Sequence, residues 1–405
     1  MTETPKACQP NGPLLGIKVL DLSRVLAGPF CSMILADLGA EVVKVEEIDK
    51  GDQTRTIPPF IEGESHYFQA INRNKQSIAV DLKTPEGQAI IKELTKHCDV
   101  LVENFRPGVM DRLGLSYADL CKVKPDLIMC SISGFGQTGP MASVPSFDLI
   151  TQALSGVMSI NGELNGPPTK LGLPMGDLAG GLWAAIGALS GVVHRQKTGE
   201  GLHVDLSLLE GLMGLLGYLA QLHFFTGENP ERVGSNHHSI VPYGRFEVKD
   251  GHIVLALHVG SFWRKFCVSI DRHDLIESPK FKTTRDRSAN REELLDIVNA
   301  ILLTKTAAEW TAIFELNDVP HGSVNTIGEA LAQEVVNVRG LIKEVMHPMA
   351  GKMKLVGSPL HFGKQFDHEP YHAAPLLGEN TRDILEKTGF SPSQVDDWLD
   401  KGIVA

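Results

Sequence analysis

The sequence is poor in cysteine, and none of its cysteines stand at CxxC spacing. Six cysteines among 405 residues do not match the disulfide framework of a small secreted domain or a cysteine-rich zinc site. The chain also opens without a basic segment followed by an apolar one, and no uncharged run reaches about 18 apolar residues. We therefore expect a cytoplasmic protein with reduced thiols and no membrane partner.

Positive charge is scarce as well. The chain holds 38 Lys and Arg against 49 Asp and Glu, a formal net charge of −11, and such a field repels a nucleic-acid backbone. We expect no nucleic-acid partner. A small anionic ligand stays compatible with this charge, because a few well-placed Lys and Arg side chains can hold a phosphate.

The composition is that of a folded globular protein, with 42% hydrophobic and 21% charged residues. The first 140 residues alternate short apolar runs with helical segments punctuated by Pro and Gly. Such βαβ units predict an α/β fold with a doubly wound parallel sheet. The expected strands are 16–23, 41–46, 77–81, 100–103 and 125–132, with helices at 27–39 and 85–97.

The sequence changes character further along the chain. The small apolar segment 177–195 predicts a tightly packed core helix that is too short to cross a bilayer. A strand at 203–207 and one long apolar helix at 208–225 follow. Between 226 and 330 the chain is rich in Pro, Gly and His turns, with a hairpin expected across the Asp-Gly turn at 250–251. We interpret this middle stretch as a smaller α+β domain.

Two motifs match known sites by their letters only. Residues 134–139 spell GxGxxG, but Pro140 and Pro145 follow where a dinucleotide-binding helix would begin. A tight loop is therefore a better interpretation than nicotinamide or flavin binding. Residues 368–372 spell HExxH, but Pro370 lies inside the helix that a zinc site would need. We expect a surface loop there and no metal.

The most informative acid is Asp177, which stands among small residues at the start of the apolar segment 177–195. By letters alone a helix N-cap is the simpler interpretation. A functional carboxylate is the other. The two roles can coexist, because a carboxylate at a helix N-terminus stays ionised and keeps a fixed direction.

Eight short segments along the chain form a family pattern, and no single one of them carries it. The segments are 20–29, 51–55, 72–77, 103–108, 134–136, 176–177, 197–199 and 375–379. Through them nearly all 405 residues resemble the class III CoA-transferase family, of the formyl-CoA transferase and carnitine CoA-transferase type, and within it the succinyl-CoA:glutarate members.

The resemblance implies a Rossmann-like large domain built from both chain ends, a smaller middle domain, and two chains interlocked as a homodimer. On this basis we expect the large domain to begin with residues 1–225 and the small domain to span 226–330. The segment 331–405 is expected to return to the large domain.

The resemblance also implies that Asp177 is the catalytic nucleophile. Its carboxylate, expected to be ionised at neutral pH from an ordinary pKa of about 4, attacks a thioester carbonyl, expels CoA thiolate and later becomes an aspartyl thioester of CoA. Coenzyme A thioesters are the substrates, and no prosthetic group is needed. In the family a glycine loop covers this aspartate, but the matching stretch here, 258–261, holds a single glycine.

The CoA-binding residues carried over from the family lie near expected strand ends, where open α/β sheets bind ligands. Glu47 stands where formyl-CoA transferase has Arg, and Pro145 where it has Lys, so formyl and oxalyl substrates are disfavoured. The residues expected at the CoA are Arg24, Leu26, Ala27, Lys83, Asn104 and Arg112.

Similarity to the succinyl/glutarate members around 238–243 favours transfer of CoA between dicarboxylates, from succinyl-CoA to an acceptor such as glutarate. Arg55 and Arg73 are candidates to hold the remote carboxylate. The other substrate candidates are Phe147, His238 and Tyr243.

Two alternative functions stay open. A racemase or epimerase of the same family carries His before the aspartate that corresponds to Asp148, but Phe147 stands there and disfavours this reading. A non-catalytic acyl-CoA-binding protein would have no use for Asp177 in its glycine-rich setting. We therefore favour CoA transfer.

Overall fold

The computed structural model describes residues 12–363 and 371–405, and the chain divides into two compact units. The first unit contains the described residues up to Val157, then Leu171–Gly217, and those from Val335 onward. The second contains Met158–Lys170 and Tyr218–Glu334. Both ends of the described chain therefore belong to one unit.

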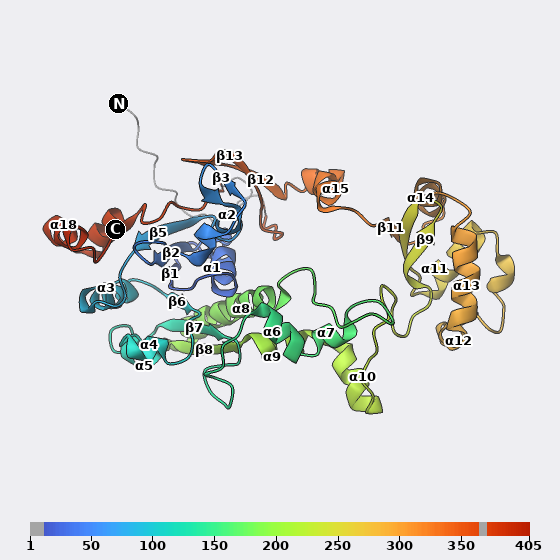
Figure 1. Cartoon of the computed structure of the whole chain (residues 1–405), viewed down its shortest axis with the longest axis horizontal. Helices are drawn as coiled ribbons and strands as arrows, with labels where there is room; N and C mark the ends of the chain where they lie inside the picture. The colour runs from blue at the N-terminus through green and yellow to red at the C-terminus, as the bar shows by residue number, and fades with distance from the viewer. Residues whose placement is uncertain (1–11, 364–370) are drawn as a thin grey trace. The chain divides into compact units, whose positions relative to one another are not determined.

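The first unit is built on a six-stranded sheet with the strand order β5-β2-β1-β6-β7-β8 (Figure 1). Every neighbouring pair is parallel, which confirms the predicted α/β fold with a parallel sheet. From β1 the chain builds outward to β2 and β5, and β6 then returns to the other side of β1. The strands are β1 (Lys18–Asp21), β2 (Glu41–Glu46), β5 (Lys75–Ala79), β6 (Val100–Glu103), β7 (Ile128–Ser133) and β8 (Leu202–Ser207).

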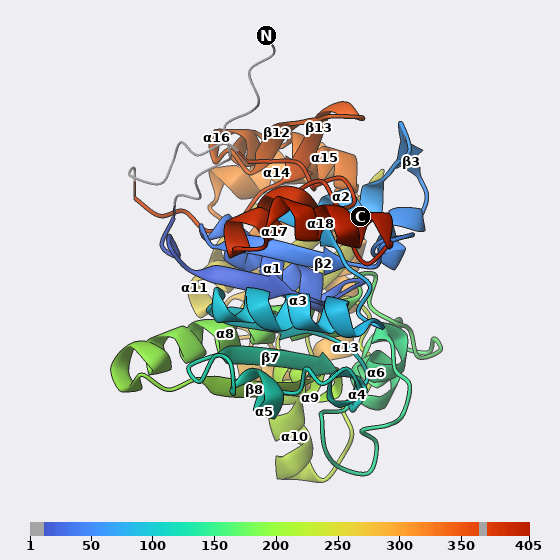
Figure 2. The same ribbon diagram turned by 90° about the vertical axis from the view of Figure 1, so that its left-hand side faces the viewer.

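Alternate residues of each strand face two different helical layers, because successive side chains of a strand point to opposite sides. In β1, Val19 packs in the core cluster that joins the sheet to the first layer, and Leu20 packs in the cluster that joins it to the second. The second layer lies toward the viewer in Figure 2. The first layer consists of α1 (Ala27–Asp37) and α8 (Met175–Thr198), and the second of α3 (Pro85–Lys96), α17 (Thr381–Thr388) and α18 (Pro392–Asp400).

The apolar segment predicted at 177–195 is longer than expected. It forms α8, a helix of 24 residues, which is long enough to cross a bilayer. The expectation that it is too short is therefore wrong. Half of its most apolar stretch is buried inside the chain, where Ala184, Ala188 and Val192 pack on the sheet and on α1. The helix thus packs as part of the core, which was the other half of the prediction.

The single helix predicted at 208–225 is also wrong. The segment forms two helices, α9 (Leu208–Leu215) and α10 (Tyr218–Thr226). Gly217 between them has a φ of 52°, in the left-handed region that glycine tolerates without strain. The break falls at the boundary between the two units.

The GxGxxG letters at 134–139 form the tight loop that was predicted. They follow β7 in irregular chain, and the next helix, α6 (Asp148–Leu154), begins well beyond them. Gly136 and Gly139 have φ values of 90° and 93°, which favour glycine for backbone reasons alone. Of the HExxH letters at 368–372, the first three residues lie outside the described chain, and His372 stands in irregular structure.

The second unit has a core of its own around a three-stranded sheet in the order β11-β10-β9. The expected hairpin is confirmed, because β9 and β10 pair antiparallel from Tyr243 to Ala256. Helices pack their aromatic side chains against this sheet. The elements are β9 (Tyr243–Val248), β10 (Gly251–Ala256), β11 (His321–Ser323), α11 (Gly260–Ser269), α13 (Arg291–Leu302) and α14 (Ala307–Leu316).

Candidate active site

Asp177 lies in the first turn of α8, and a different carboxylate caps that helix. The residue before the helix, Pro174, makes no capping hydrogen bond through its side chain. Instead Asp148 accepts hydrogen bonds through Oδ1 from the backbone nitrogens of Gly176 and Asp177, at 2.7 and 3.4 Å. Asp177 is therefore not the N-cap, and the functional carboxylate is the interpretation that the geometry favours.

A buried amide fixes the orientation of this cap. The Nε2 of Gln152 donates to Asp148 Oδ2 at 2.7 Å, and its Oε1 accepts from the backbone nitrogen of Leu171 at 2.9 Å. Gln152 is fully buried. Both oxygens of Asp148 are thus engaged, so its carboxylate is held in one direction beside Asp177.

The two carboxylates change how Asp177 titrates. Burial raises the pKa of Asp177, and the neighbouring charge of Asp148 adds to this and brings it to about 7. The expectation of an ordinary, fully ionised aspartate at neutral pH is therefore wrong. When it is ionised, a carboxylate with a raised pKa is more basic than usual and so a stronger nucleophile.

Tyr67 is a residue of this site that the sequence analysis missed. It lies in α2 (His66–Ile71). Burial raises the pKa of Tyr67, and the negative charges of Asp177, Asp148 and Asp52 raise it further. Its ring packs in the same apolar cluster as Leu178, the residue after Asp177. No motif marks this tyrosine, because only tertiary folding brings α2 beside the start of α8.

The start of α1 packs closely against α8 near Asp177. A Cβ atom on Gly181 would stand 2.7 Å from the carbonyl oxygen of Ala27 and 2.9 Å from Cδ1 of Phe30, so the approach requires glycine there. Leu26 and Ala27, both expected at the CoA, are only 4% and 3% exposed. Both therefore pack inside the first unit and leave little surface for a ligand to contact.

A cavity of about 400 Å³ opens at the carboxyl ends of β1 and β2 and beside the chain that follows β5. It lies next to β1, where the strand order reverses, and open α/β sheets bind ligands at that point. Arg24 and Lys83, both expected at the CoA, line this cavity. Glu47, one of the departures from the formyl-CoA transferase pattern, lines it too.

Two further residues expected at the CoA lie beside the cavity. The side chain of Asn104 makes two hydrogen bonds to the backbone of Arg24. Its Oδ1 accepts from the Arg24 nitrogen at 2.9 Å, and its Nδ2 donates to the Arg24 oxygen at 2.7 Å. The guanidinium of Arg24 stands over the ring of Phe105, 4.7 Å from its centroid. Arg112 is exposed at the end of α4 (Val109–Arg112), the short helix that gives Val109 to the cavity wall.

Arg55 and Arg73 already have carboxylate partners inside the protein. Arg55 donates to both oxygens of Glu46, at 2.7 and 2.8 Å, and stands 3.6 Å from the centroid of the Phe68 ring. Arg73 donates to Asp37 at 3.0 and 2.5 Å. Each guanidinium is thus engaged in a bidentate ion pair before any substrate arrives, and this arrangement is structural in kind.

The remaining substrate candidates are divided between the units. Phe147 is 70% exposed, directly before Asp148, and belongs to the first unit. His238 and Tyr243 belong to the second unit, where His238 Nε2 lies 2.8 Å from the carbonyl oxygen of Glu231. The stretch expected to cover Asp177, 258–261, includes the start of α11 in the same second unit.

The fold and the site define a doubly wound α/β protein that has a carboxylate of raised pKa in the first turn of α8 and a cavity at the carboxyl ends of β1 and β2. A family model described as CoA-transferase family III matches residues 14–381. The chain belongs to this family, as its sequence pattern predicted, and it is therefore an enzyme of the CoA-transferase class. This family membership excludes the alternative of a non-catalytic binding protein.

Named relatives match over nearly the full chain. The succinyl-CoA:glutarate CoA-transferase of Homo sapiens is 41% identical over 394 residues, which cover 97% of this chain and 90% of that protein. The succinate–glutarate CoA-transferase of Agrobacterium fabrum is 38% identical, with 95% and 97% covered. The acetyl-CoA:oxalate CoA-transferase of Acetobacter aceti is 37% identical, with 94% and 96% covered.

Solved structures agree with the fold of the chain. A CAIB/BAIF family protein from Brucella suis has a TM-score of 0.82 at 33% identity and covers 93% of this chain and 100% of that one. Rv3272 from M. tuberculosis has a TM-score of 0.81 at 30% identity, with 92% and 98% covered. Both support the α/β architecture with a central parallel sheet.

Proposed function

We propose that this chain moves CoA from succinyl-CoA to a dicarboxylate acceptor such as glutarate. Two of the relatives are named for succinate or succinyl-CoA together with glutarate, and a third is named for oxalate. The acceptors in these names differ in length, but each has two carboxylates. A dicarboxylate acceptor is thus the feature that the relatives share, and glutarate is the acceptor that the 41% identical relative favours.

In the proposed mechanism, the Asp177 carboxylate attacks the thioester carbonyl of the donor and expels CoA thiolate, leaving an acyl-aspartyl anhydride. The thiolate attacks the aspartyl carbonyl of the anhydride, which releases the donor acid and leaves an aspartyl-CoA thioester. The acceptor carboxylate then attacks this thioester and frees the thiolate again. Attack of the thiolate on the new acyl group gives the product and restores Asp177.

This cycle is balanced without any outside reagent. In each step one bond to an acyl carbon forms as another breaks, and the leaving group is the CoA thiolate, the donor acid or, in the last step, the Asp177 carboxylate. No step changes an oxidation state. The proposed enzyme therefore requires no prosthetic group. Anhydrides react with water, so the partly buried position of Asp177, near Leu178 and Tyr67, favours transfer over hydrolysis.

The single observation that supports the proposal is the carboxylate of Asp177, with its raised pKa, in the first turn of α8. The test is to incubate the enzyme with succinyl-CoA, trap it with hydroxylamine or borohydride, and map the tryptic peptides by mass spectrometry. We expect CoA mass on the peptide that contains position 177 before trapping, and a hydroxamate or alcohol there afterwards. Turnover without either would refute the mechanism.

A panel of acceptors tests the substrate class separately. We expect product acyl-CoA from glutarate and other dicarboxylates and little from monocarboxylates of equal length. Transfer to monocarboxylates alone would contradict the dicarboxylate proposal while leaving the role of Asp177 intact. A racemase would instead exchange the α-proton of an acyl-CoA with deuterated water, and Phe147 in place of a histidine base makes us expect no such exchange.

We also propose an interlocked homodimer, with 1–225 and 331–405 forming the large domain and 226–330 the small one. The outer face of α8 supports it, because Leu182, Ile186 and Val193 are 49–52% exposed on one helix and such apolar patches mark interaction sites. In sedimentation experiments we expect a dimer for the wild-type chain and dissociation for Ile186→Glu. The matched control is Leu15→Glu, at a 64% exposed position outside α8. A monomeric wild type would contradict the proposal.

A further inference from the structure

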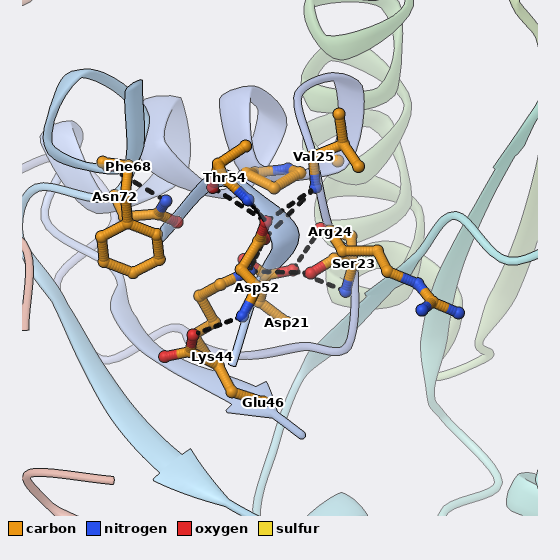
Figure 3. Close-up of polar contacts among 12 residues, drawn as sticks. Asp21, Ser23, Arg24, Val25, Lys44, Glu46, Asp52, Thr54, Phe68 and Asn72 are labelled. Atoms are coloured by element: carbon orange, nitrogen blue, oxygen red, sulfur yellow. Dashed lines mark hydrogen bonds and ion pairs between the residues drawn. The ribbon is translucent and has the colours of Figure 1, made fainter. Parts of the chain in front are cut away.

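The turn between β1 and α1 is held in place by side chains. Its three residues, 23–25, make backbone hydrogen bonds to side chains from four separate parts of the first unit. Figure 3 labels Asp21, Lys44 and Asp52 among these partners. The bonds run from Ser23 N to Asp21 Oδ1 at 2.9 Å, from Lys44 Nζ to Ser23 O at 2.8 Å, from Arg24 N to Asn104 Oδ1 at 2.9 Å, from Asn104 Nδ2 to Arg24 O at 2.7 Å, and from Val25 N to Asp52 Oδ2 at 3.2 Å.

Val25 has a backbone conformation that a β-branched residue does not adopt unaided. Its φ is 68°, in the left-handed region where Cβ crowds the backbone, and valine is among the residues least suited to it. Such strain persists only where the surroundings over-determine the conformation. The partner of the Val25 nitrogen is the carboxylate of Asp52, at 3.2 and 3.3 Å from its two oxygens.

Asp52 is itself rigidly held. Lys44 Nζ lies 3.0 Å from Asp52 Oδ2, and the two side chains are 0% and 1% exposed. Thr54 donates to Asp52 Oδ1 through its backbone nitrogen at 2.9 Å and its hydroxyl at 2.8 Å. Burial opposes ionisation of Asp52, but Lys44 and Thr54 outweigh it and keep the pKa of this carboxyl below its ordinary value. The acceptor that faces Val25 therefore stays charged.

The turn connects the cavity with the neighbourhood of Asp177. Ser23, Arg24 and Asp52 line the 400 Å³ cavity. Val25 and Leu26 pack in one apolar cluster with Tyr67 and Leu178, and Leu178 follows Asp177 in the sequence. A change in the Val25 conformation would thus alter the wall of the cavity and the packing beside the nucleophile together.

We propose that Asp52 is a positioning residue for CoA binding, which holds Val25 in its left-handed conformation so that the 23–25 turn presents its backbone to the thioester. This inference rests on the proposed function, because it takes the cavity beside β1 as the CoA site. Asp52 does not need to touch the ligand, and its effect reaches the ligand through the backbone of Val25 and Arg24.

A double-mutant cycle separates positioning from simple stabilisation. Glycine adopts a φ near 68° without strain, so Val25→Gly supplies the conformation that Asp52 otherwise enforces. We expect Asp52→Ala to raise the Kd for CoA, measured by calorimetry, about tenfold or more. Val25→Gly is the reference for the cycle, and we expect the double variant to bind CoA within about threefold of Val25→Gly.

Rescue is the readout that a merely structural role would not give. If Asp52 only neutralised Lys44, Val25→Gly would leave the loss caused by Asp52→Ala unchanged, and that result would overturn the inference. Unchanged CoA affinity in a folded Asp52→Ala variant would overturn it as well. If Asp52→Ala does not fold, the isosteric Thr54→Val takes its place in the cycle, because it removes only the hydroxyl that orients Asp52 Oδ1.

A matched control removes an ion pair elsewhere in the same unit. Asp99 precedes β6 at the amino end of the sheet and lies 2.8 Å from Arg195. Asp99→Asn should lower stability and leave CoA affinity at the wild-type value. Failure of the wild-type chain to bind CoA would overturn both the proposed CoA site and the inference. A Kd for CoA that is the same in the wild type and in Asp52→Ala would overturn the inference alone.

Discussion

The carboxylate of Asp148 accepts a hydrogen bond from the backbone nitrogen of Asp177, at 3.4 Å. Burial raises the pKa of Asp177, and the charge of Asp148 raises it further. One side chain therefore does two things at the start of α8. It satisfies the exposed N–H groups of the helix, and it makes the neighbouring carboxylate more basic. The geometry and the basicity of the proposed nucleophile, Asp177, therefore depend on the same residue.

The pH dependence of the reaction should report this pair. In the proposed mechanism the ionised form of Asp177 is the nucleophile, and its pKa is about 7, so kcat/KM should rise as the pH increases through about 7 and then level off. Asp148→Asn removes the like charge but keeps an oxygen for the Gly176 nitrogen. We expect its acid limb to move to lower pH with a lower plateau. A profile identical to the wild type would contradict the coupling.

Removal of the nucleophile should separate catalysis from binding. Asp177→Asn has the same shape as the wild-type residue but cannot form the anhydride. We expect transfer activity to fall by about a thousandfold or more, while the Kd for CoA measured by calorimetry stays within about threefold. An Asp177→Asn enzyme with full activity, after mass spectrometry has excluded deamidation, would rule out covalent catalysis by this residue.

The same substitution should change stability in a pH-dependent way. The pKa of Asp177 is raised from an ordinary 3.8 to about 7 in the folded chain, so the folded state binds this proton more tightly than the unfolded state. Folding stability from this group is therefore lost as the pH rises from about 4 to about 7. Asp177→Asn should raise the denaturant midpoint at pH 8 more than at pH 4.5. A shift of equal size at both pH values would indicate a packing effect instead.

Gly176 should be intolerant of a side chain. A Cβ atom there would stand 2.7 Å from Thr151 Oγ1 and 2.9 Å from Asp148 Oδ1, so alanine would displace the cap. We expect Gly176→Ala to lose about 1–3 kcal/mol of stability and at least about tenfold in kcat. The control is Gly172→Ala, where no atom lies within 4 Å of the added carbon. Equal behaviour of the two variants would contradict this account.

Local patterns in the sequence were sufficient to predict the parallel sheet and the place of Asp177. The spacing of apolar residues that marks strands and helices is a local property of the sequence. The parallel strands that it predicted are present in the structure from β1 to β8. The length of α8 and the break at Gly217 were not predicted, because composition alone does not show where an apolar helix ends. The cap on α8 was missed for a different reason, since Asp148 lies 28 residues before Gly176 and only tertiary folding joins them.

Charges near the strand ends were the least predictable part of the site. From the sequence, Arg55 and Arg73 were candidates to hold the remote carboxylate of the substrate, and Lys83 was expected at the CoA. The structure engages Arg55 and Arg73 in ion pairs with side chains that are at most 13% exposed, and leaves Lys83 82% exposed. Burial and partner choice depend on which strands become neighbours, so residue type and position in the chain could not separate these three.

The mouth of the cavity gives the last prediction. Lys83 Nζ lies 3.8 Å from Glu47 Oε1, with the side chains 82% and 57% exposed, and CoA brings phosphates that attract the first and repel the second. Lys83→Ala should raise the Kd for CoA about threefold to tenfold, and Glu47→Gln should lower it about twofold to threefold. Both effects should shrink in calorimetric titrations at high salt, because exposed charges are screened. Lys122→Ala, a 73% exposed lysine paired with Asp119, is the control and should change nothing. If Glu47→Gln weakens binding instead, the phosphates of CoA do not lie beside Lys83 and Glu47 at the mouth of the cavity.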